Sequence, residues 1–291
     1  MGIRLHRTKA VAAATAVVSA AAMALVAVAP AEAATAVKTV RVRMSDSSIT
    51  FTGGGATTAG GVTTLHAGRY HFHVVGRGGG HSLQLLRFQN GYTAQQAQQD
   101  FNDAFEGNVP AVQRVDNGVV FLGGADAAPK HPGDMVVKLN ATQLMAVDFA
   151  GDGNTTAMVN VVGKAPDQAK VPHDGKYTAF SYGWEVSKHL PASGMVKFAN
   201  QADQPHFLVI QRVKDSTTNA KVRKFINSGG EGNPPWVLKA SAESGVVSPG
   251  KSQLFSYDLP AGKYLAACFW PDYFTGMPHV FMGMWKLVTL S

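Results

Sequence analysis

The feature that most constrains the fold of this chain is an internal repeat. His81 and His206 each open an apolar, strand-like run, and they lie 125 residues apart. The Glu-Gly-Asn triplets that begin at Glu106 and Glu231 have the same offset. Self-similarity at a fixed period is the signature of a duplicated structural unit, and equal offsets at unrelated residue types are difficult to obtain by chance. The sequence therefore predicts two copies of one fold in tandem.

Strand-like segments dominate both copies. Short runs of alternating or β-branched residues are separated by Gly, Asn, Asp and Pro clusters, which is typical of an all-β sandwich or barrel. In the first copy these runs are 37–44, 61–65, 70–75, 82–88, 118–122, 134–139, 143–149 and 157–162. Residues 93–105 open with Thr93, a good N-cap, and 217–227 occupies the matching place in the second copy. We expect a short helical insertion in each half.

The first 33 residues have the pattern of an export signal. Basic residues precede an Ala-rich apolar run over 10–29, and residues 31–33 (Ala-Glu-Ala) form an A-x-A cleavage site. An uncleaved membrane anchor is the alternative, since the run is about twenty residues long. Its weak hydrophobicity favours cleavage. We expect a secreted, extracellular protein with no membrane span after signal cleavage.

The predicted domains are a signal peptide over 1–33, a first β domain over 34–165 and a second over 166–291, joined by a polar linker near 164–170. The formal charge is +7 at pH 7, but Lys and Arg are scattered rather than clustered. This pattern argues against binding of nucleic acid, and it suits association with an anionic cell envelope.

The common catalytic motifs do not occur in the sequence. It contains no G-x-S-x-G, H-E-x-x-H or P-loop motif. Asp148, Asp152 and Asp272 are isolated from one another and form no acid–base pair. No complete catalytic constellation is found, which favours a role other than catalysis.

The last thirty residues hold an unusual set of donor groups. Cys268 is the only cysteine of the chain, and His279 and Met284 follow it. In an exported protein, one unpaired cysteine is a liability, an intermolecular link or a protected ligand. A thiolate, imidazoles and a thioether select copper, and a blue-copper site combines two His and one Cys with a long axial Met. His206 is the best candidate for the second histidine.

Together with the repeat, these residues resemble a cupredoxin duplicated in tandem. The second copy has the family's order, with His206 on an early strand, Cys268 on the penultimate strand and a ligand loop that ends at His279 and Met284. The resemblance implies an all-β fold of two tandem cupredoxin-like Greek-key β-sandwiches. It also implies one copper ion in the second domain, with His206, Cys268 and His279 in a plane and Met284 in the axial position.

The two copies differ at the site. Where the second copy has its cysteine, the first has Val147 or Asp148, and no His-x4-Met follows. The first copy is therefore expected to lack a complete copper site. In the second copy, ten residues separate Cys268 from His279, more than in small blue-copper proteins. This bulky loop is expected to reshape or cover the site.

A second pair of histidines, His71 and His73, lies two residues apart in a strand-like run and therefore on one face of the strand. Multicopper oxidases use such pairs, but they also place histidines around the cysteine, whereas Ala267 and Phe269 flank Cys268. We therefore do not expect a multicopper oxidase, and we interpret His71 and His73 as a solvated or interface feature of the first domain.

Each candidate ligand also has a simpler interpretation. The simpler interpretation of Cys268 is a small buried hydrophobe, which the spacing of the following His and Met makes the weaker alternative; that of Met284 is a core residue at the start of the last strand. Met277 and Met282 compete with Met284 for the axial position. The alternative for His206 is a purely structural role, because the first copy has a histidine at the matching position, His81, but no cysteine.

Two functions are consistent with this site. The leading hypothesis is electron transfer or copper carriage outside the cell, with a redox or copper-transfer protein as the partner. The loop aromatics Trp270, Tyr273 and Phe274 are expected to exclude water from the site and to form the docking patch for this partner. The alternative is a metal-free binding module on the same fold, in which Cys268 is buried and inert.

Overall fold

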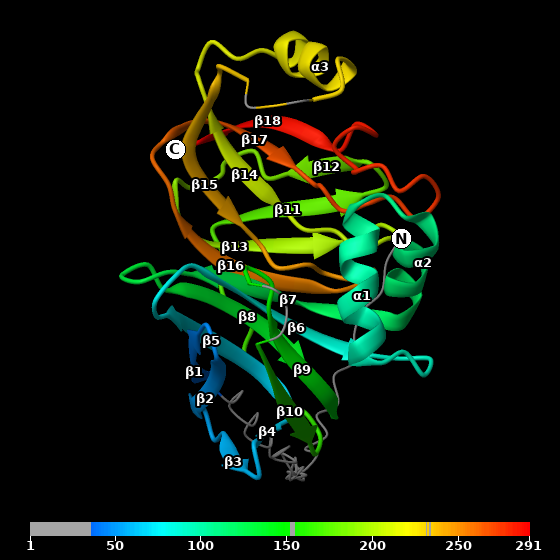
Figure 1. Cartoon of the computed structure of the whole chain (residues 1–291). Coiled ribbons are helices and arrows are strands. Elements are labelled where there is room, and N and C mark those ends of the chain that lie inside the picture. The colour runs from blue at the N-terminus through cyan, green and yellow to red at the C-terminus, as the bar shows by residue number, and fades with distance from the viewer. Residues whose placement is uncertain (1–35, 152–154, 231, 233) are drawn as a thin grey trace, which may run out of the picture. The chain divides into compact units, whose positions relative to one another are not determined.

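The computed structural model describes residues 36–151, 155–230, 232 and 234–291 (Figure 1). The predicted signal peptide lies outside these residues. None of the helices in the described part of the chain is long and apolar enough to cross a membrane.

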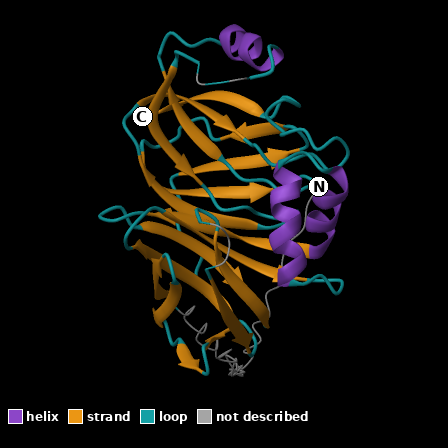
Figure 2. Ribbon diagram, in the orientation of Figure 1, coloured by secondary structure: helices purple, strands orange, loops and turns teal. Residues whose placement is uncertain are grey.

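Strands make up most of the described structure (Figure 2). The first half contains β1 (Lys38–Ser45), β2 (Ser48–Gly53), β3 (Thr57–Ala59), β4 (Val62–His66), β5 (Gly68–Gly76), β6 (His81–Phe88), α1 (Ala94–Phe105), α2 (Val109–Gly118), β7 (Val119–Ala127), β8 (Gly133–Leu139), β9 (Thr142–Asp148) and β10 (Thr156–Val162). The second half contains β11 (Gly175–Phe180), β12 (Gly183–Val186), β13 (Ser193–Asn200), β14 (Val209–Val213), α3 (Asn219–Asn227), β15 (Val237–Glu243), β16 (Ser252–Asp258), β17 (Gly262–Ala267) and β18 (Trp285–Leu290).

The two halves repeat one pattern of strand pairing. In the first half β1 pairs in parallel with β5, β5 pairs antiparallel with β8, and β9 pairs antiparallel with both β6 and β10. In the second half β11, β13, β16, β14, β17 and β18 make the corresponding pairs in the same orientations. The prediction of an all-β fold made of two tandem cupredoxin-like β-sandwiches is confirmed.

One sheet runs through both sandwiches. Its strand order is β12-β11-β13-β16-β8-β5-β1-β2, and the antiparallel pair of β8 with β16 joins the halves. A six-stranded sheet (β3-β4-β10-β9-β6-β7) packs on the first half of this sheet, and a four-stranded sheet (β15-β14-β17-β18) packs on the second half. Each half therefore encloses a core between two sheets.

The burial pattern of β5 explains why such segments form strands. Tyr70, Phe72 and Val74 are buried and alternate with the half-buried His71 and His73. Successive side chains of a strand point to opposite faces, so this alternation turns one face toward the core. Burying a side chain such as Phe72 completely stabilises the fold by about 1.5–3 kcal/mol.

The helical insertions differ from the prediction in number. α1 begins after Thr93, which forms a capping box with Gln96, and α3 begins after Thr218. Both helices were expected. The first half has a further helix, α2, that was not predicted. Its N-cap Asn108 and the Pro110 of its first turn are ordinary helix-start signals in the sequence.

Gln84 links the two halves in the protein interior. Its buried side-chain Nε2 donates hydrogen bonds to the carbonyl oxygens of Gly123 (3.0 Å) and Val246 (3.1 Å), and its Oε1 accepts one from the Val246 backbone N–H (2.8 Å). One side chain of the first half therefore satisfies both backbone groups of a buried residue in the second half.

We expect Gln84→Leu to lower the free energy of unfolding by about 1–3 kcal/mol, because it leaves buried backbone groups of Val246 without partners. Urea denaturation followed by circular dichroism measures this change. Gln95→Leu, on the exposed side of α1, is the matched control and should change the stability by less than about 0.5 kcal/mol. Equal losses in the two variants would contradict a structural role for the Gln84 amide.

Candidate metal centre

Three predicted ligands lie together in the second half. The sulfur of Cys268 is 3.5 Å from Nδ1 of His206 and 3.7 Å from Nδ1 of His279. The two Nδ1 atoms are 3.0 Å apart. All three donor atoms lie within 4.8 Å of one another, so a single small ion between them would contact all three.

Different segments bring the three residues together. Cys268 directly follows β17, and His279 lies in the loop between β17 and β18. His206 precedes β14 and forms a two-way backbone bridge with Val247 (N···O distances of 3.2 and 2.8 Å). Asn200 supports this bridge, because its Nδ2 donates to the carbonyl of Val247 (2.8 Å).

The backbone of the loop brings its two ends back together. The N–H of Cys268 donates to the carbonyl of Met284 (3.2 Å), and the N–H of Met284 donates to the carbonyl of His279 (3.0 Å). The N–H of His279 in turn donates to the carbonyl of Trp270 (2.9 Å). These bonds hold Cys268, His279 and Met284 next to one another although fifteen residues lie between the first and the last.

The donor groups are sealed from solvent. The relative exposure is 0% for Cys268 and His279 and 1% for His206. Burial, together with the charge of His279, places the pKa of His206 well below its ordinary value. Burial also lowers the pKa of His279 to about 4 and raises that of the Cys268 thiol to about 12. Both imidazoles are therefore neutral at pH 7, which is the form that binds metals.

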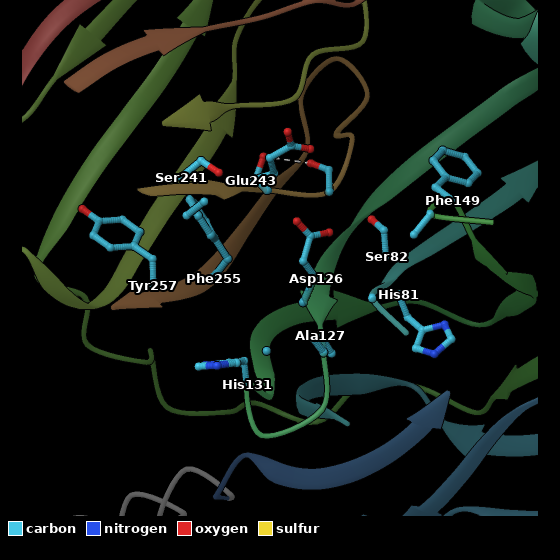
Figure 3. Close-up of a pocket in the computed structure, with 18 of the residues that line it drawn as sticks. His81, Ser82, Asp126, Ala127, His131, Phe149, Ser241, Glu243, Phe255 and Tyr257 are labelled. Atoms are coloured by element: carbon cyan, nitrogen blue, oxygen red, sulfur yellow. Dashed lines mark hydrogen bonds between the residues drawn. The ribbon is translucent and has the colours of Figure 1, made fainter. Parts of the chain in front are cut away.

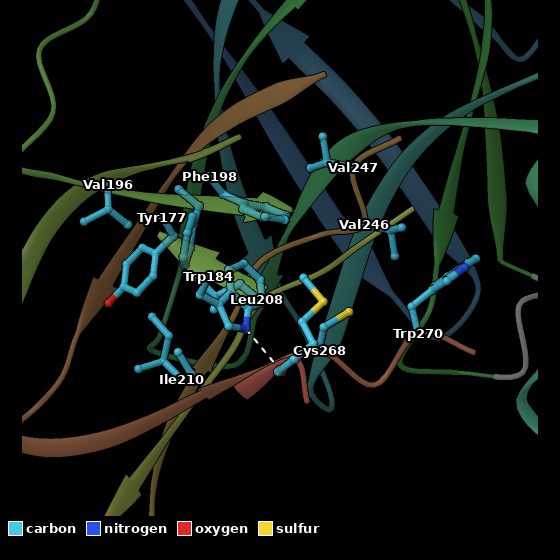
Figure 4. Packing of buried hydrophobic residues seen from close by; sticks show 14 of the residues in the cluster. Tyr177, Trp184, Val196, Phe198, Leu208, Ile210, Val246, Val247, Cys268 and Trp270 are labelled. Carbon is cyan, nitrogen blue, oxygen red and sulfur yellow. Dashed lines mark hydrogen bonds between the residues drawn. The ribbon is translucent and has the colours of Figure 1, made fainter. Parts of the chain in front are cut away.

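Apolar side chains surround the sulfur. Figure 4 shows Cys268 among core residues, with Leu208 and Trp184 to one side, Val246 above and Trp270 on the other side. Such surroundings exclude water and give the site a low dielectric.

Among the three candidate thioethers, Met284 fits the site best. It is completely buried and belongs to the same core cluster as Cys268. Met282 is only half-buried, and Met277 is 47% exposed. The exposure of Met277 argues against it as an axial ligand.

A hydrogen-bond relay fixes the proton of His279. Its Nε2 lies 3.1 Å from the amide oxygen of Gln204, and because that oxygen can only accept, Nε2 carries the proton. The amide is held in this orientation at both ends: its Nε2 donates to Asp272 (3.0 Å), and its oxygen also accepts from the N–H of Tyr273 (2.8 Å). The lone pair of His279 is therefore on Nδ1, the atom that faces Cys268.

This relay was not predicted from the sequence. The interpretation of Asp272 as an isolated acid is wrong, because the carboxylate is buried and accepts hydrogen bonds from Tyr182 (2.6 Å), Gln204 and Thr275. Burial opposes its ionisation, but these hydrogen bonds hold its pKa below the ordinary value. The only signal available beforehand was the position of Gln204, two residues before a candidate ligand.

The first half forms part of the wall around the site. The indole of Trp270 packs on Phe105 of α1 and Phe121 of β7 (ring centroids at 5.6 and 5.2 Å). Its Nε1 donates to Asp116 of α2 (3.1 Å). Burial raises the pKa of Asp116 to about 8, so this carboxyl is protonated at neutral pH. Trp270 is 1% exposed, which fits its predicted role in excluding water, but its predicted place in the docking patch is wrong.

In the first half, an ion pair takes the place of the thiol. Leu83 of β6 pairs with Asp148 of β9, and the same register in β14 and β17 places Leu208 opposite Cys268. Asp148 is thus the counterpart of the cysteine. Its Oδ2 lies 2.6 Å from Nδ1 of His81, whose Nε2 lies 2.8 Å from the carbonyl of Arg77. Because both ring nitrogens face acceptors, the protonated imidazolium form of His81 is favoured, and its pKa is raised.

A separate cavity of about 640 Å³ lies between the halves. Figure 3 shows Asp126 and Glu243 on opposite sides of it, with His81, Ser82 and His131 nearby. None of the four predicted ligands lines it. This opening is therefore distinct from the candidate metal centre.

No protein-family model and no curated protein matches the chain. Several solved structures are similar to it. Reduced auracyanin from Roseiflexus castenholzii is 16% identical and covers 40% of this chain and 94% of its own, with a TM-score of 0.25. Auracyanin A, a blue copper protein from Chloroflexus aurantiacus, is 10% identical. The match covers 44% of this chain and 100% of auracyanin A, with a TM-score of 0.31. A copper nitrite reductase from Nitrosomonas europaea is 12% identical. The match covers 89% of this chain and 94% of the reductase, with a TM-score of 0.22. Similarity at this level says nothing about what this chain binds.

We expect the stability provided by His81 to depend on pH. Burial alone would lower its pKa, but the hydrogen bonds to Arg77 and Asp148, with the charge of Asp148, raise it. The contribution is therefore complete below the unfolded-state pKa of about 6.5 and is lost as the pH rises through the raised folded-state value. His81→Gln should accordingly destabilise the protein by about 3–5 kcal/mol in acid, where it removes one member of a buried pair, and by less in alkali.

Urea denaturation at a series of pH values measures this difference. The matched control is His189→Gln, because His189 is exposed. A loss of stability in His81→Gln that stays constant from about pH 5 to about pH 9 would contradict the charged pair.

Proposed function

We propose that the second half binds one copper ion in a type-1-like site and that the protein transfers single electrons. The observation that carries this proposal is the convergence of two imidazole Nδ1 atoms and one cysteine sulfur within 4.8 Å in a sealed interior. Two histidines and a cysteine with a weak axial methionine are the donor set of blue-copper electron-transfer sites. The proposed ligands are His206, Cys268, His279 and, in the axial position, Met284.

Burial of the ligands favours electron transfer over copper carriage. A carrier has to hand its ion to a partner, which requires a ligand that solvent or another protein reaches. Here the three donor residues are at most 1% exposed. An electron needs no such opening, so a sealed site suits its transfer.

The residues of the chain have distinct roles in this proposal. Gln204 directs the Nδ1 lone pair of His279 toward the ion, and Trp184 and Trp270 help to exclude water. A bound copper ion would supply one-electron redox chemistry. Because the pKa of the free Cys268 thiol is about 12, the thiol has to lose its proton when the metal binds. Copper uptake by the metal-free protein is therefore coupled to proton release.

The setting of this activity is also part of the proposal. We infer export through the predicted signal peptide and action outside the cell, where the net positive charge suits an anionic envelope. The partner would be a redox protein. With Trp270 buried, the exposed apolar side chains of this loop that could meet the partner are Phe269 (41% exposed), Phe274 (70%) and Met277 (47%).

The visible spectrum tests the proposal directly. A protein that starts at Ala34 should develop an intense thiolate-to-copper band with one equivalent of Cu(II), and Cys268→Ser should abolish it, because only a thiolate ligand produces this band. Met277→Leu is the matched control and should keep the band. A colourless protein without bound copper would overturn the proposal and favour the metal-free binding module.

We expect Gln204→Leu to weaken copper binding roughly 10- to 100-fold, because the variant no longer fixes the tautomer and orientation of His279. Competition with a chelator measures the affinity, and the band position reports the altered ligand. Gln201→Leu, three residues earlier and exposed, should bind as the wild type does. Equal affinity of Gln204→Leu and wild type would show that the relay does not position the imidazole.

A further inference from the structure

A cavity of about 540 Å³ lies between α3 and the outer face of the four-stranded sheet. Val222 of α3 packs with Val213, Leu265 and Ala267 of this sheet (Figure 1). Helix and sheet therefore form opposite walls of the cavity. Its volume is within the range of about 300–1,000 Å³ that is typical of small-molecule sites.

The segments that line this cavity also carry the proposed copper ligands. Successive side chains of a strand point to opposite faces. Cys268 belongs to the core between the two sheets, and Ala267, the residue before it, lines the cavity. Phe207 and Val280, which directly follow the two ligand histidines, line it as well. A molecule in the cavity would thus lie against the backbone that positions all three ligands.

Aromatic side chains supply much of the wall. Phe207, Phe225, Trp236 and Phe281 line the cavity, and each is only half-buried. The rings of Phe225 and Trp236 meet edge to face, with their centroids 5.8 Å apart. Aromatic rings make favourable stacked and edge-to-face contacts with one another, so these partly exposed rings would gain contacts from a ligand that is itself aromatic.

The charge of the lining disfavours an anionic ligand. Glu243 is the only ionisable side chain among the described residues that line the cavity, and it pairs with Val209 on the sheet. Burial and the charge of Asp126 raise the pKa of Glu243 to about 7, so it is mostly ionised at about pH 8. With one carboxylate and no Lys or Arg in the described lining, a ligand that carries negative charge would be repelled.

We infer that this cavity binds a small, neutral aromatic molecule. The inference goes beyond the proposed electron transfer and does not depend on it, because the cavity is formed by the chain alone. Phe207 and Glu243 also line the opening between the halves. Variants that test this cavity therefore change other residues.

Fluorescence titration of the metal-free chain with N-phenylnaphthylamine, a neutral aromatic probe, tests the site. We expect one probe molecule to bind per chain. Trp236→Ala removes part of the wall and Val209→Phe fills the space, so each should weaken binding at least roughly tenfold. Phe274→Ala is the matched control: it changes an exposed aromatic residue outside the cavity and should bind the probe as the wild type does.

A second probe tests the charge of the site. Anilinonaphthalene sulfonate has the same rings and an added negative charge, and at about pH 8 it should bind at least roughly tenfold more weakly than the neutral probe. Equal binding of the two probes would overturn the inference. So would no binding of the neutral probe, wild-type affinity in both Trp236→Ala and Val209→Phe, or an equal loss in Phe274→Ala. Unaltered thermal unfolding shows that each variant is folded.

Discussion

The structure around the candidate centre depends on how one loop closes on itself. Backbone hydrogen bonds from Cys268 to Met284 and from His279 to Trp270 hold a thiol and an imidazole against the buried His206, where solvent does not reach. Buried polar groups require partners, yet Nε2 of His206 has none among the described residues. The fold thus places donor atoms where few neighbours can form hydrogen bonds with them. Such an arrangement lowers the free energy of unfolding.

The duplication has produced two unequal sandwiches. In one, His206 faces a thiol and a second histidine; in the other, the equivalent His81 faces the carboxylate of Asp148 and a backbone carbonyl. In the first half, Asp148 thus stands where the second half has Cys268, and the soft sulfur donor is replaced by a carboxylate. The first half then acquires another role, because its α1, α2 and β7 receive the Trp270 indole and so cover the loop of the second half.

Much of this architecture could be predicted from the sequence. The equal offsets of His81 and His206 indicated the duplication, and alternating strands such as β5 indicated the sandwiches. The cluster of His206, Cys268 and His279 followed from the chemistry of the donor set. What could not be predicted were contacts between residues distant in sequence. The Gln204 relay to Asp272 and the cover of Trp270 by Asp116 depend on which segments pack together, and local residue patterns do not encode that. The exposure of Trp270 was misjudged for this reason.

The pairing of β8 with β16 joins the two halves in one continuous sheet. Neither strand is an edge in the complete sheet. If the second half were produced alone, β16 would present a row of unpaired N–H and C=O groups, which is a template for strand addition and aggregation. The apolar seat of Trp270 would be lost at the same time. A cut between the two copies would therefore expose an unpaired strand edge on the half that holds the candidate metal centre.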